Sequence, residues 1–253
     1  MKKLFGHNNE VVSMTLSSCG KYLASSSKAR YSHNCFLLVW SAETYEVIAT
    51  LPGHESTVVC LAFSPDSKYL ASSGKDRSLC IYEKQTDTTT GGVTYIPILC
   101  MKNIHKRIVW DLNWSSDGGL LATVARDGIC KVWKIEQEQI SSAVPLSCIH
   151  SFNPFQGQAI TAIAIGQKVI VNEKIGWLVV LGSEAGDLQL CTMHPVTGEC
   201  HTIFQVPAIY SHGKTVKKLK WRPRSTIVDA QNMNEWASCG EDNSVRIHRY
   251  RFL

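Results

Sequence analysis

The chain has 253 residues, 44% of them hydrophobic, and its 26 lysine and arginine residues against 21 acidic residues give a net charge of +5. This much apolar sequence excludes disorder over the whole length, and the mild positive charge permits a polyanionic partner without requiring one. No apolar run of about 18 residues is present, and no apolar segment follows the lysines of MKKLFGHNNE, so we expect no membrane span and no secretory signal.

An internal repeat of about 50 residues organises the sequence. Residues 54–82 align without a gap to residues 105–133, and both segments hold a histidine, a serine-containing turn and an aspartate at the same spacing. In chain order, the copies begin at His7, at His54, at His105, near residue 159 in a fainter form, and at His212. We predict one domain, 1–253, with repeats at about 5–50, 51–100, 101–148, 149–207 and 208–253.

Apolar residues alternate within each copy, as in Val58, Leu61 and Phe63 before the turn sequence SPDS. Such alternation between turn sequences is typical of short strands joined by tight turns. A helical period occurs only weakly, at 134–142, and the TTTGG sequence at 88–92 lacks the rest of a phosphate-binding motif, so we interpret it as a linker between repeats. The predicted fold class is therefore all-β.

The cysteines are scattered through apolar stretches, and no two of them have the C-x-x-C spacing of a zinc site. They are Cys19, Cys35, Cys60, Cys80, Cys100, Cys130, Cys148, Cys191, Cys200 and Cys239. We expect reduced, buried thiols that pack as small hydrophobic side chains. We expect no metal ion and no cofactor.

Three features recur in register along the chain. Gly-His precedes the first strand at residues 6–7 and 53–54, an aspartate lies in the turn before the third strand, and Tyr82 or Trp133 follows that aspartate by six residues. These features resemble the WD-repeat family, in which each repeat is one four-stranded blade of a β-propeller. The resemblance implies about five four-stranded blades, either as a five-bladed ring or as part of an incomplete seven-bladed propeller.

In WD repeats a histidine, a hydroxyl residue, the turn aspartate and a third-strand tryptophan form a hydrogen-bonded chain, and the resemblance implies such sets here. The sets are His54, Ser72, Asp76 and Tyr82; His105, Thr123, Asp127 and Trp133; and His212, Ser238 and Asp242, with His248 in the tryptophan position. A Ser-His-Asp hydrolase uses the same residue types, but it needs one nucleophile in one pocket, whereas these sets recur at regular spacing. We therefore predict a structural role and no catalytic residue.

Some segments resemble more narrowly the family of Elongator second subunits. They are KARYSHNC at 28–35 with the adjoining NCFLLVW, HKRIVWDLNW at 105–114, and ASCGEDNSVRIHR at 237–249. This resemblance implies a non-catalytic scaffold, cytoplasmic and also nuclear, that holds the catalytic and third subunits of a complex that modifies wobble uridine in tRNA. A generic WD-repeat adaptor of another complex is the alternative.

Loops at one face of a rigid propeller are exposed and suited to partner binding. Repeat register places four candidate partner-binding residues there, around the first strand or just before the turn aspartate: Trp110, Arg126, Lys75 and Lys217. Tryptophan and arginine dominate binding hot spots, which favours the first two. The alternative for Trp110 is packing between blades.

The densest positive charge is KTVKKLKWRPR at 214–224. Its candidate polyanion-binding residues are Lys214, Lys218, Lys220, Arg222 and Arg224. Cations interleaved with an aromatic residue can bind a phosphate backbone in a salt-dependent manner, so tRNA or an acidic microtubule surface is an alternative partner. A solvated strand face, with Val216 and Leu219 inward, explains the same pattern. No membrane partner is expected.

Overall fold

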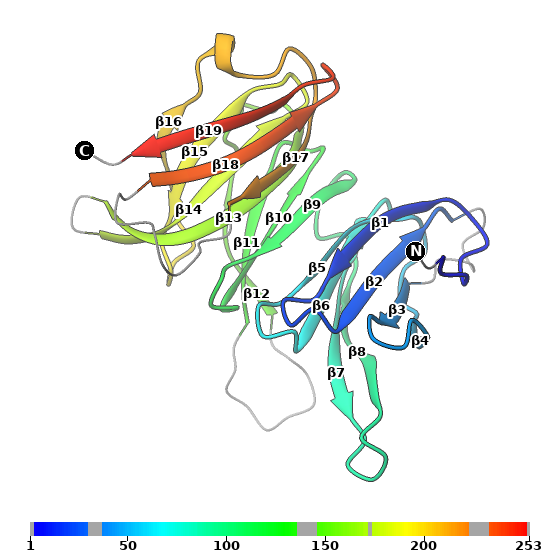
Figure 1. Ribbon diagram of the computed structural model, residues 1–253. Helices are drawn as coiled ribbons and strands as arrows, with labels where there is room; N and C mark the ends of the chain where they lie inside the picture. The colour runs from blue at the N-terminus through cyan, green and yellow to red at the C-terminus, as the bar shows by residue number, and fades with distance from the viewer. Residues whose placement is uncertain (1–2, 30–36, 136–145, 172–173, 223–232, 252–253) are drawn as a thin grey trace. The chain divides into compact units, whose positions relative to one another are not determined.

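The computed structural model describes residues 3–29, 37–135, 146–171, 174–222 and 233–251. In this part of the chain the regular structure is β-strand, apart from one 3-10 turn, η1, at Ala208–Tyr210. The strands form five sheets, and within each sheet the strands lie side by side in chain order (Figure 1). The predicted all-β class is therefore confirmed.

The strand bounds follow the repeats. The first sheet contains β1 (Val11–Leu16), β2 (Tyr22–Ser27), β3 (Leu37–Ser41) and β4 (Val47–Leu51). The second contains β5 (Val58–Phe63), β6 (Tyr69–Gly74), β7 (Leu79–Thr86) and β8 (Val93–Met101). The third contains β9 (Val109–Trp114), β10 (Leu120–Ala125), β11 (Cys130–Ile135) and β12 (Leu146–Phe152). The fourth contains β13 (Ile160–Val171), β14 (Lys174–Ser183), β15 (Leu188–Met193) and β16 (Cys200–Gln205), and the fifth contains β17 (Val216–Trp221), β18 (Met233–Gly240) and β19 (Val245–Arg251).

The chain divides into two compact units. One consists of residues 1–121 and 134–147, and the other of residues 122–133 and 148–253. The first and second sheets lie wholly in the first unit, and the fourth and fifth lie wholly in the second. The assignment of 1–253 to a single domain stays a prediction.

The turns between first and second strands use serine and aspartate in the same way in two repeats. Ser64 Oγ donates to Asp66 Oδ1 at 2.5 Å and accepts from the backbone N–H of Tyr69 at 2.9 Å. Ser115 Oγ donates to Asp117 Oδ1 at 2.7 Å and accepts from the N–H of Leu120 at 2.9 Å. These side chains satisfy backbone groups that a tight turn leaves unpaired, which explains why SPDS and SSDGG separate the strands.

Tryptophan side chains tie neighbouring sheets together within each unit. Trp114, at the end of β9, donates its indole N–H to the carbonyl of Ala62 in β5 at 3.1 Å. Trp221, at the end of β17, donates in the same way to Ala164 in β13 at 2.9 Å. Apolar residues also bury the surface between neighbouring sheets: Leu70 belongs to a core cluster of the first and second sheets and Leu190 to one of the fourth and fifth, and both are fully buried.

The fifth sheet departs from the predicted pattern of four strands, because in the part of the chain that the structure describes it contains β17, β18 and β19 only. The TTTGG segment is not a linker between repeats: it belongs to the turn that joins β7 to β8 within the second sheet, where the Asp87 carboxylate accepts from Thr89 and Thr90. Most of the weak helical segment at 134–142 and of the insert at 28–35 lies outside the described residues.

The expectation of uniformly reduced, buried cysteines is wrong in two respects. Cys80 of β7 and Cys100 of β8 are directly opposite in register and form a disulfide. Cys19 and Cys148 are exposed thiols. Strand pairing explains the first result, since it brings two residues 20 positions apart in sequence into contact.

Among the described residues, no helix is long and apolar enough to cross a bilayer.

Candidate functional site

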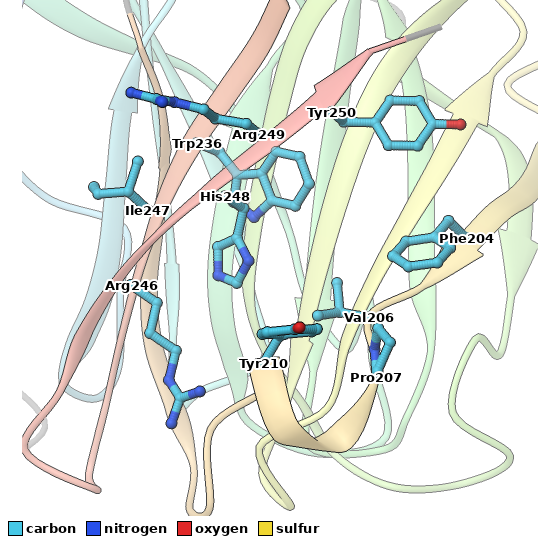
Figure 2. Close-up of a pocket in the computed structure, with 10 residues that line it drawn as sticks. All are labelled: Phe204, Val206, Pro207, Tyr210, Trp236, Arg246, Ile247, His248, Arg249 and Tyr250. Carbon is cyan, nitrogen blue, oxygen red and sulfur yellow. The ribbon is translucent and has the colours of Figure 1, made fainter. Parts of the chain in front are cut away.

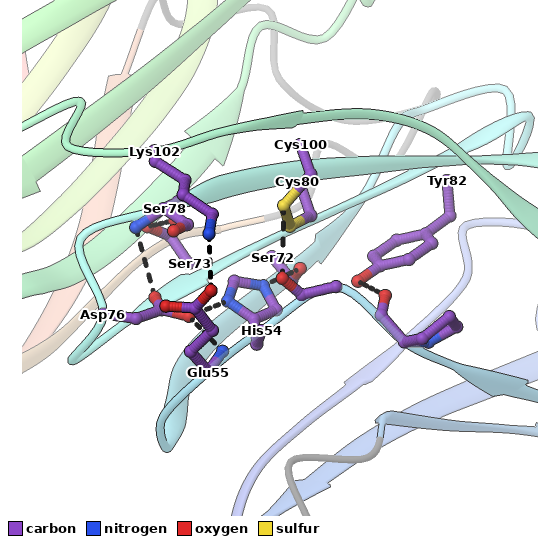
Figure 3. Close-up of a disulfide and its surroundings, with 12 residues drawn as sticks. His54, Glu55, Ser72, Ser73, Asp76, Ser78, Cys80, Tyr82, Cys100 and Lys102 are labelled. Atoms are coloured by element: carbon purple, nitrogen blue, oxygen red, sulfur yellow. Dashed lines mark hydrogen bonds and ion pairs between the residues drawn. A yellow bond between two sulfur atoms is a disulfide. The ribbon is translucent and has the colours of Figure 1, made fainter. Parts of the chain in front are cut away.

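In the second sheet, His54, Ser72 and Asp76 form a hydrogen-bonded chain (Figure 3). His54 Nδ1 lies 2.8 Å from Asp76 Oδ2, and His54 Nε2 lies 2.7 Å from Ser72 Oγ. An ionised carboxylate only accepts, so His54 Nδ1 carries a proton and donates it to Asp76, while Nε2 pairs with the Ser72 hydroxyl. Asp76 also accepts from the backbone N–H groups of Glu55 and Ser78, which fixes the start of the repeat to the turn before β7.

The environment keeps Asp76 ionised. Burial alone would raise the pKa of its carboxyl, but the hydrogen bond and charge interaction with His54 and the two backbone N–H groups hold that pKa below its usual value. Tyr82 stands in the tryptophan position and donates its hydroxyl to the carbonyl of Pro52 at 2.9 Å (Figure 3). Burial raises the pKa of the Tyr82 hydroxyl, so it stays a hydrogen-bond donor.

The fifth sheet contains a longer chain of the same kind. His212 Nδ1 lies 2.9 Å from Asp242 Oδ1, and Ser238 Oγ lies 2.8 Å from His212 Nε2 and 2.9 Å from His248 Nε2. Ser238 Oγ therefore links the two imidazole rings. Burial lowers the pKa of His248 to about 4, with the nearby His212 and Arg246 acting in the same direction, so its ring is neutral at pH 7. His248 thus stands in the tryptophan position and pairs with the hydroxyl of the set.

Two other repeats show parts of the chain. Trp40 donates its indole N–H to Ser25 Oγ at 2.8 Å, and Ser25 lies 2.7 Å from His7 Nε2. Trp133 donates to Thr123 Oγ1 at 3.0 Å, and Asp127 accepts from the backbone N–H of Ile129. His105 of the same repeat is buried, with 3% of its surface exposed.

The hydroxyl groups in these sets are out of reach of a substrate. Ser72 and Thr123 are 0% exposed and Ser238 is 1% exposed. A nucleophile must contact the atom that it attacks, whereas these hydroxyls lie inside sheets and recur from repeat to repeat. Buried polar groups that pair with one another avoid a cost of about 1–3 kcal/mol each, so the arrangement can specify the fold.

Four of the first strands contain a β-bulge near the end that faces the loops. The register between first and second strands shifts by one residue at Val12, Val59, Thr161 and Lys217, so each of these is an extra residue in its strand. Lys217 is exposed and pairs with Glu241. Bulges re-aim side chains, which puts residues at this position next to the loops.

The remaining candidate partner-binding residues differ in exposure. Lys75 and Arg126 are exposed, and Trp110 is half-buried. Lys75 follows β6 and Arg126 follows β10, so both lie at the exit of a second strand. Their role in binding stays a prediction.

The basic segment of the fifth sheet presents its cations outward. Lys214, Lys218 and Lys220 are exposed, while Val216 and Leu219 are 0% and 1% exposed. Arg222 pairs with Glu235 at 2.5 Å, and Arg224 lies outside the described residues.

The described part of the chain contains no group of three or more histidine, cysteine, aspartate or glutamate side chains that could hold a metal ion.

Comparison with protein families identifies the repeat. The model of the WD domain, G-beta repeat, matches residues 1–41, 45–83 and 99–134, which are the first three copies. The chain carries WD repeats. Their sheets have the fold class of WD β-propeller blades, and a crystal structure of the computationally designed Ika8 protein shares this fold, with a TM-score of 0.63 and 21% identity over 96% of this chain and 59% of that one.

Curated relatives of this WD-repeat chain are named Elongator complex protein 2. The protein from Arabidopsis thaliana is 30% identical over 99% of this chain, that from Drosophila melanogaster is 31% identical over 98%, and that from Homo sapiens is 27% identical over 98%. The matches span 29%, 30% and 32% of those proteins, so the chain covers about three tenths of their length.

Sequence reasoning missed the pair Trp114 and Trp221, which join neighbouring WD repeats. Both end a first strand, in the segments DLNW and KLKW, and this shared position was the available signal. A tryptophan at a strand end is more often assigned to packing than to a hydrogen bond with the adjacent sheet. The disulfide was missed because it depends on the register of β7 against β8.

Proposed function

We propose that this WD-repeat chain is a non-catalytic scaffold that docks the catalytic and third subunits of an Elongator complex and so supports wobble-uridine modification of tRNA in the cytoplasm and nucleus. The observation that carries the proposal is the similarity, over nearly the whole chain, to proteins named Elongator complex protein 2. The buried state of the recurring hydroxyls favours a structural over a catalytic role.

The loop residues give this scaffold a way to bind. Trp110 and Arg126 belong to the residue types that carry most binding energy at protein interfaces, and Arg126 is exposed. Lys75 adds positive charge at the position that Arg126 has in the next repeat, and Lys217 adds it at the first-strand bulge, where it pairs with Glu241. This charge favours an acidic rim on the partner.

Co-purification tests the proposal. The full chain, carrying a tag, is expressed with the catalytic and third subunits, and both are expected in the complex. We expect Trp110→Ala and Arg126→Glu to reduce recovery of at least one subunit about tenfold, whereas Phe5→Ala and Lys21→Glu, which alter an exposed aromatic residue and an exposed cation elsewhere, leave it unchanged. A stable monomer that binds neither subunit would instead indicate an adaptor of another complex.

The exposed lysines in and just before β17 support a second candidate, a direct contact with RNA or an acidic microtubule surface. Phosphate contacts made by Lys214, Lys218 and Lys220 would weaken by orders of magnitude between about 50 and 200 mM salt, whereas an apolar protein interface would persist. A gel-shift titration with tRNA at both salt concentrations separates the two functions.

A further inference from the structure

A disulfide ties the outer strand of the second sheet to the strand beside it. Cys80 is the second residue of β7, and Cys100 lies directly opposite it in β8. In the fifth sheet the same position of the third strand holds Arg246 (Figure 2), whose guanidinium group lies 3.5 Å from Asp242. In the remaining sheets it holds Leu38, Lys131 or Gln189. The disulfide is therefore an addition to the repeat and not part of the pattern that builds each sheet.

The two cysteines of this pair differ in their access to solvent. Cys80 is 0% exposed, whereas Cys100 is exposed on the outer strand. Gly53 lies against the pair, because a Cβ on this residue would be 3.3 Å from the Cys80 sulfur and 3.6 Å from the Cys100 sulfur. A thiolate from solution can therefore approach Cys100 but not Cys80. Exposed disulfides are the labile ones, since thiol–disulfide exchange requires direct attack on a sulfur atom.

The disulfide lies in a loosely packed stretch of chain at the end of β8 (Figure 3). Tyr95 and Ile104 are buried, but residues 96–103 between them are exposed or half-buried. Lys102 pairs with Glu55 at 2.5 Å, and because both side chains are exposed this ion pair contributes little stability. The disulfide is therefore the main side-chain tie between this stretch and the buried strand β7.

Reduction requires the two sulfur atoms to separate. Two thiols need more room than a disulfide, because atoms that are no longer bonded move apart to van der Waals contact. Gly53 and the buried surroundings of Cys80 leave no space on the inner side. The outward movement therefore falls to Cys100, and the end of β8 moves with it.

We propose that Cys100 is a redox modification site, at which small thiols and their disulfides exchange with the Cys80–Cys100 pair and so release or fix the end of β8. The loop residues of the proposed scaffold function take no part in this exchange, and it requires no Elongator subunit. The chemical class of reactant is a low-molecular-weight thiol such as glutathione, together with its disulfide.

The exchange has two steps. A thiolate attacks the Cys100 sulfur, forms a mixed disulfide there and displaces the Cys80 thiolate, which takes a proton from water. A second thiolate attacks the outer sulfur of the mixed disulfide, and the displaced Cys100 thiolate is protonated in turn. Two small thiols are thereby oxidised to one disulfide, and the protein pair gains two electrons and two protons. Oxidation by the small disulfide is the reverse of these steps.

Trapping of the mixed disulfide tests which sulfur reacts. The full chain is treated with reduced glutathione near neutral pH, exchange is stopped with acid, and peptides are analysed by mass spectrometry. We expect glutathione on Cys100 at least tenfold more often than on Cys80, full reduction of the pair at excess glutathione, and recovery of the link with glutathione disulfide. Equal modification of the two cysteines, or a pair that glutathione reduces only in denaturant, would overturn the proposal.

Single variants separate the two roles. In Cys80→Ser we expect glutathione disulfide to modify Cys100, and in Cys100→Ser we expect modification of Cys80 to be at least tenfold slower. The buried thiol of Cys60 is the folding control, because it reacts only in an unfolded chain. Where Cys60 also reacts in a variant, trapping in the unaltered chain decides. Modification of both cysteines at one rate, with Cys60 unmodified, would contradict the proposal.

Hydrogen–deuterium exchange measures the release of β8. On reduction we expect the backbone amides of residues 98–101 to exchange at least tenfold faster, while those of residues 178–181 in β14, which belongs to the other unit, change less than twofold. The double variant Cys80→Ser, Cys100→Ser should match the reduced chain without any reductant. Unchanged exchange at 98–101 would overturn the proposal. Because these assays use the chain alone, failure here leaves the co-purification result unaffected.

Discussion

Removing the carboxylate of Asp76 should destabilise the first unit strongly. In Asp76→Ala, the Nδ1 proton of His54 loses its acceptor, and the His54 side chain is only 1% exposed. An unsatisfied buried donor costs about 1–3 kcal/mol, and the two backbone N–H groups released by Asp76 add a smaller amount, so we expect a total loss of about 2–4 kcal/mol. For a chain of this size that corresponds to a fall in Tm of about 4–16 °C.

Thermal unfolding followed by circular dichroism measures the effect, with Asp87→Ala as the matched control. Asp87 accepts hydrogen bonds from both the backbone and the hydroxyl groups of Thr89 and Thr90, but it lies on an exposed turn where water replaces them. We expect its Tm to change by less than about 2 °C. An equal fall in Tm in both variants would mean that burial does not make the His54 hydrogen bonds more stabilising than exposed ones, and would refute the reasoning.

Three further perturbations test other parts of the chain. Because the pKa of His248 is lower when folded, about 4, than its ordinary 6.5, stability should fall as pH drops from about 6.5 towards 4, and denaturation midpoints of His248→Phe should fall less over that range. Mass spectrometry without reductant should find Cys80 linked to Cys100, and two free thiols would contradict this. In Cys100→Ser the free energy of unfolding in urea should fall by about 3 kcal/mol, the loop-closure value for a separation of 20 residues. In Gly186→Ala the new Cβ would lie 2.0 Å from a backbone carbonyl oxygen, at a residue whose φ is +100°, so we expect the free energy of unfolding to fall by about 2 kcal/mol or more. In the control Gly213→Ala the new Cβ has no atom within 4 Å, and we expect almost no change. Equal losses in urea unfolding would show that the turn at Gly186 relaxes.

The sequence predicted the first three strands of a repeat better than the fourth. Val58, Leu61 and Phe63 are the apolar, buried residues of a first strand, and serine and aspartate mark the turn that follows. The local sequence is therefore enough to predict these strands. Fourth strands such as β16, with the sequence CHTIFQ, are largely exposed, and little burial constrains their pattern. This is why periodicity did not indicate that the last sheet has three strands in the part of the chain that the structure describes.

Network members were easier to foresee than their bonding. His54, Ser72 and Asp76 recur at fixed spacing, whereas the donation by Tyr82 to Pro52 depends on where a loop passes. The replacement of tryptophan by His248 was visible in the sequence, but the lowered pKa of His248 follows from its burial in the folded chain. The path of a loop and the burial of a side chain are set by the whole fold, so the local sequence could not predict these two features.

The hydrogen-bond chains also have a direction. In the fifth sheet the chain runs from His248 through Ser238 and His212 to Asp242, and its last proton, on His212 Nδ1, points at the carboxylate because an ionised carboxylate only accepts. A tryptophan as first donor, like Trp40 in the first sheet, enforces that polarity because an indole nitrogen cannot accept. In the described part of the first repeat no carboxylate terminates the chain, so its alignment ends at the His7 ring, and this repeat depends more on packing than on polarised hydrogen bonds to hold its strands in register.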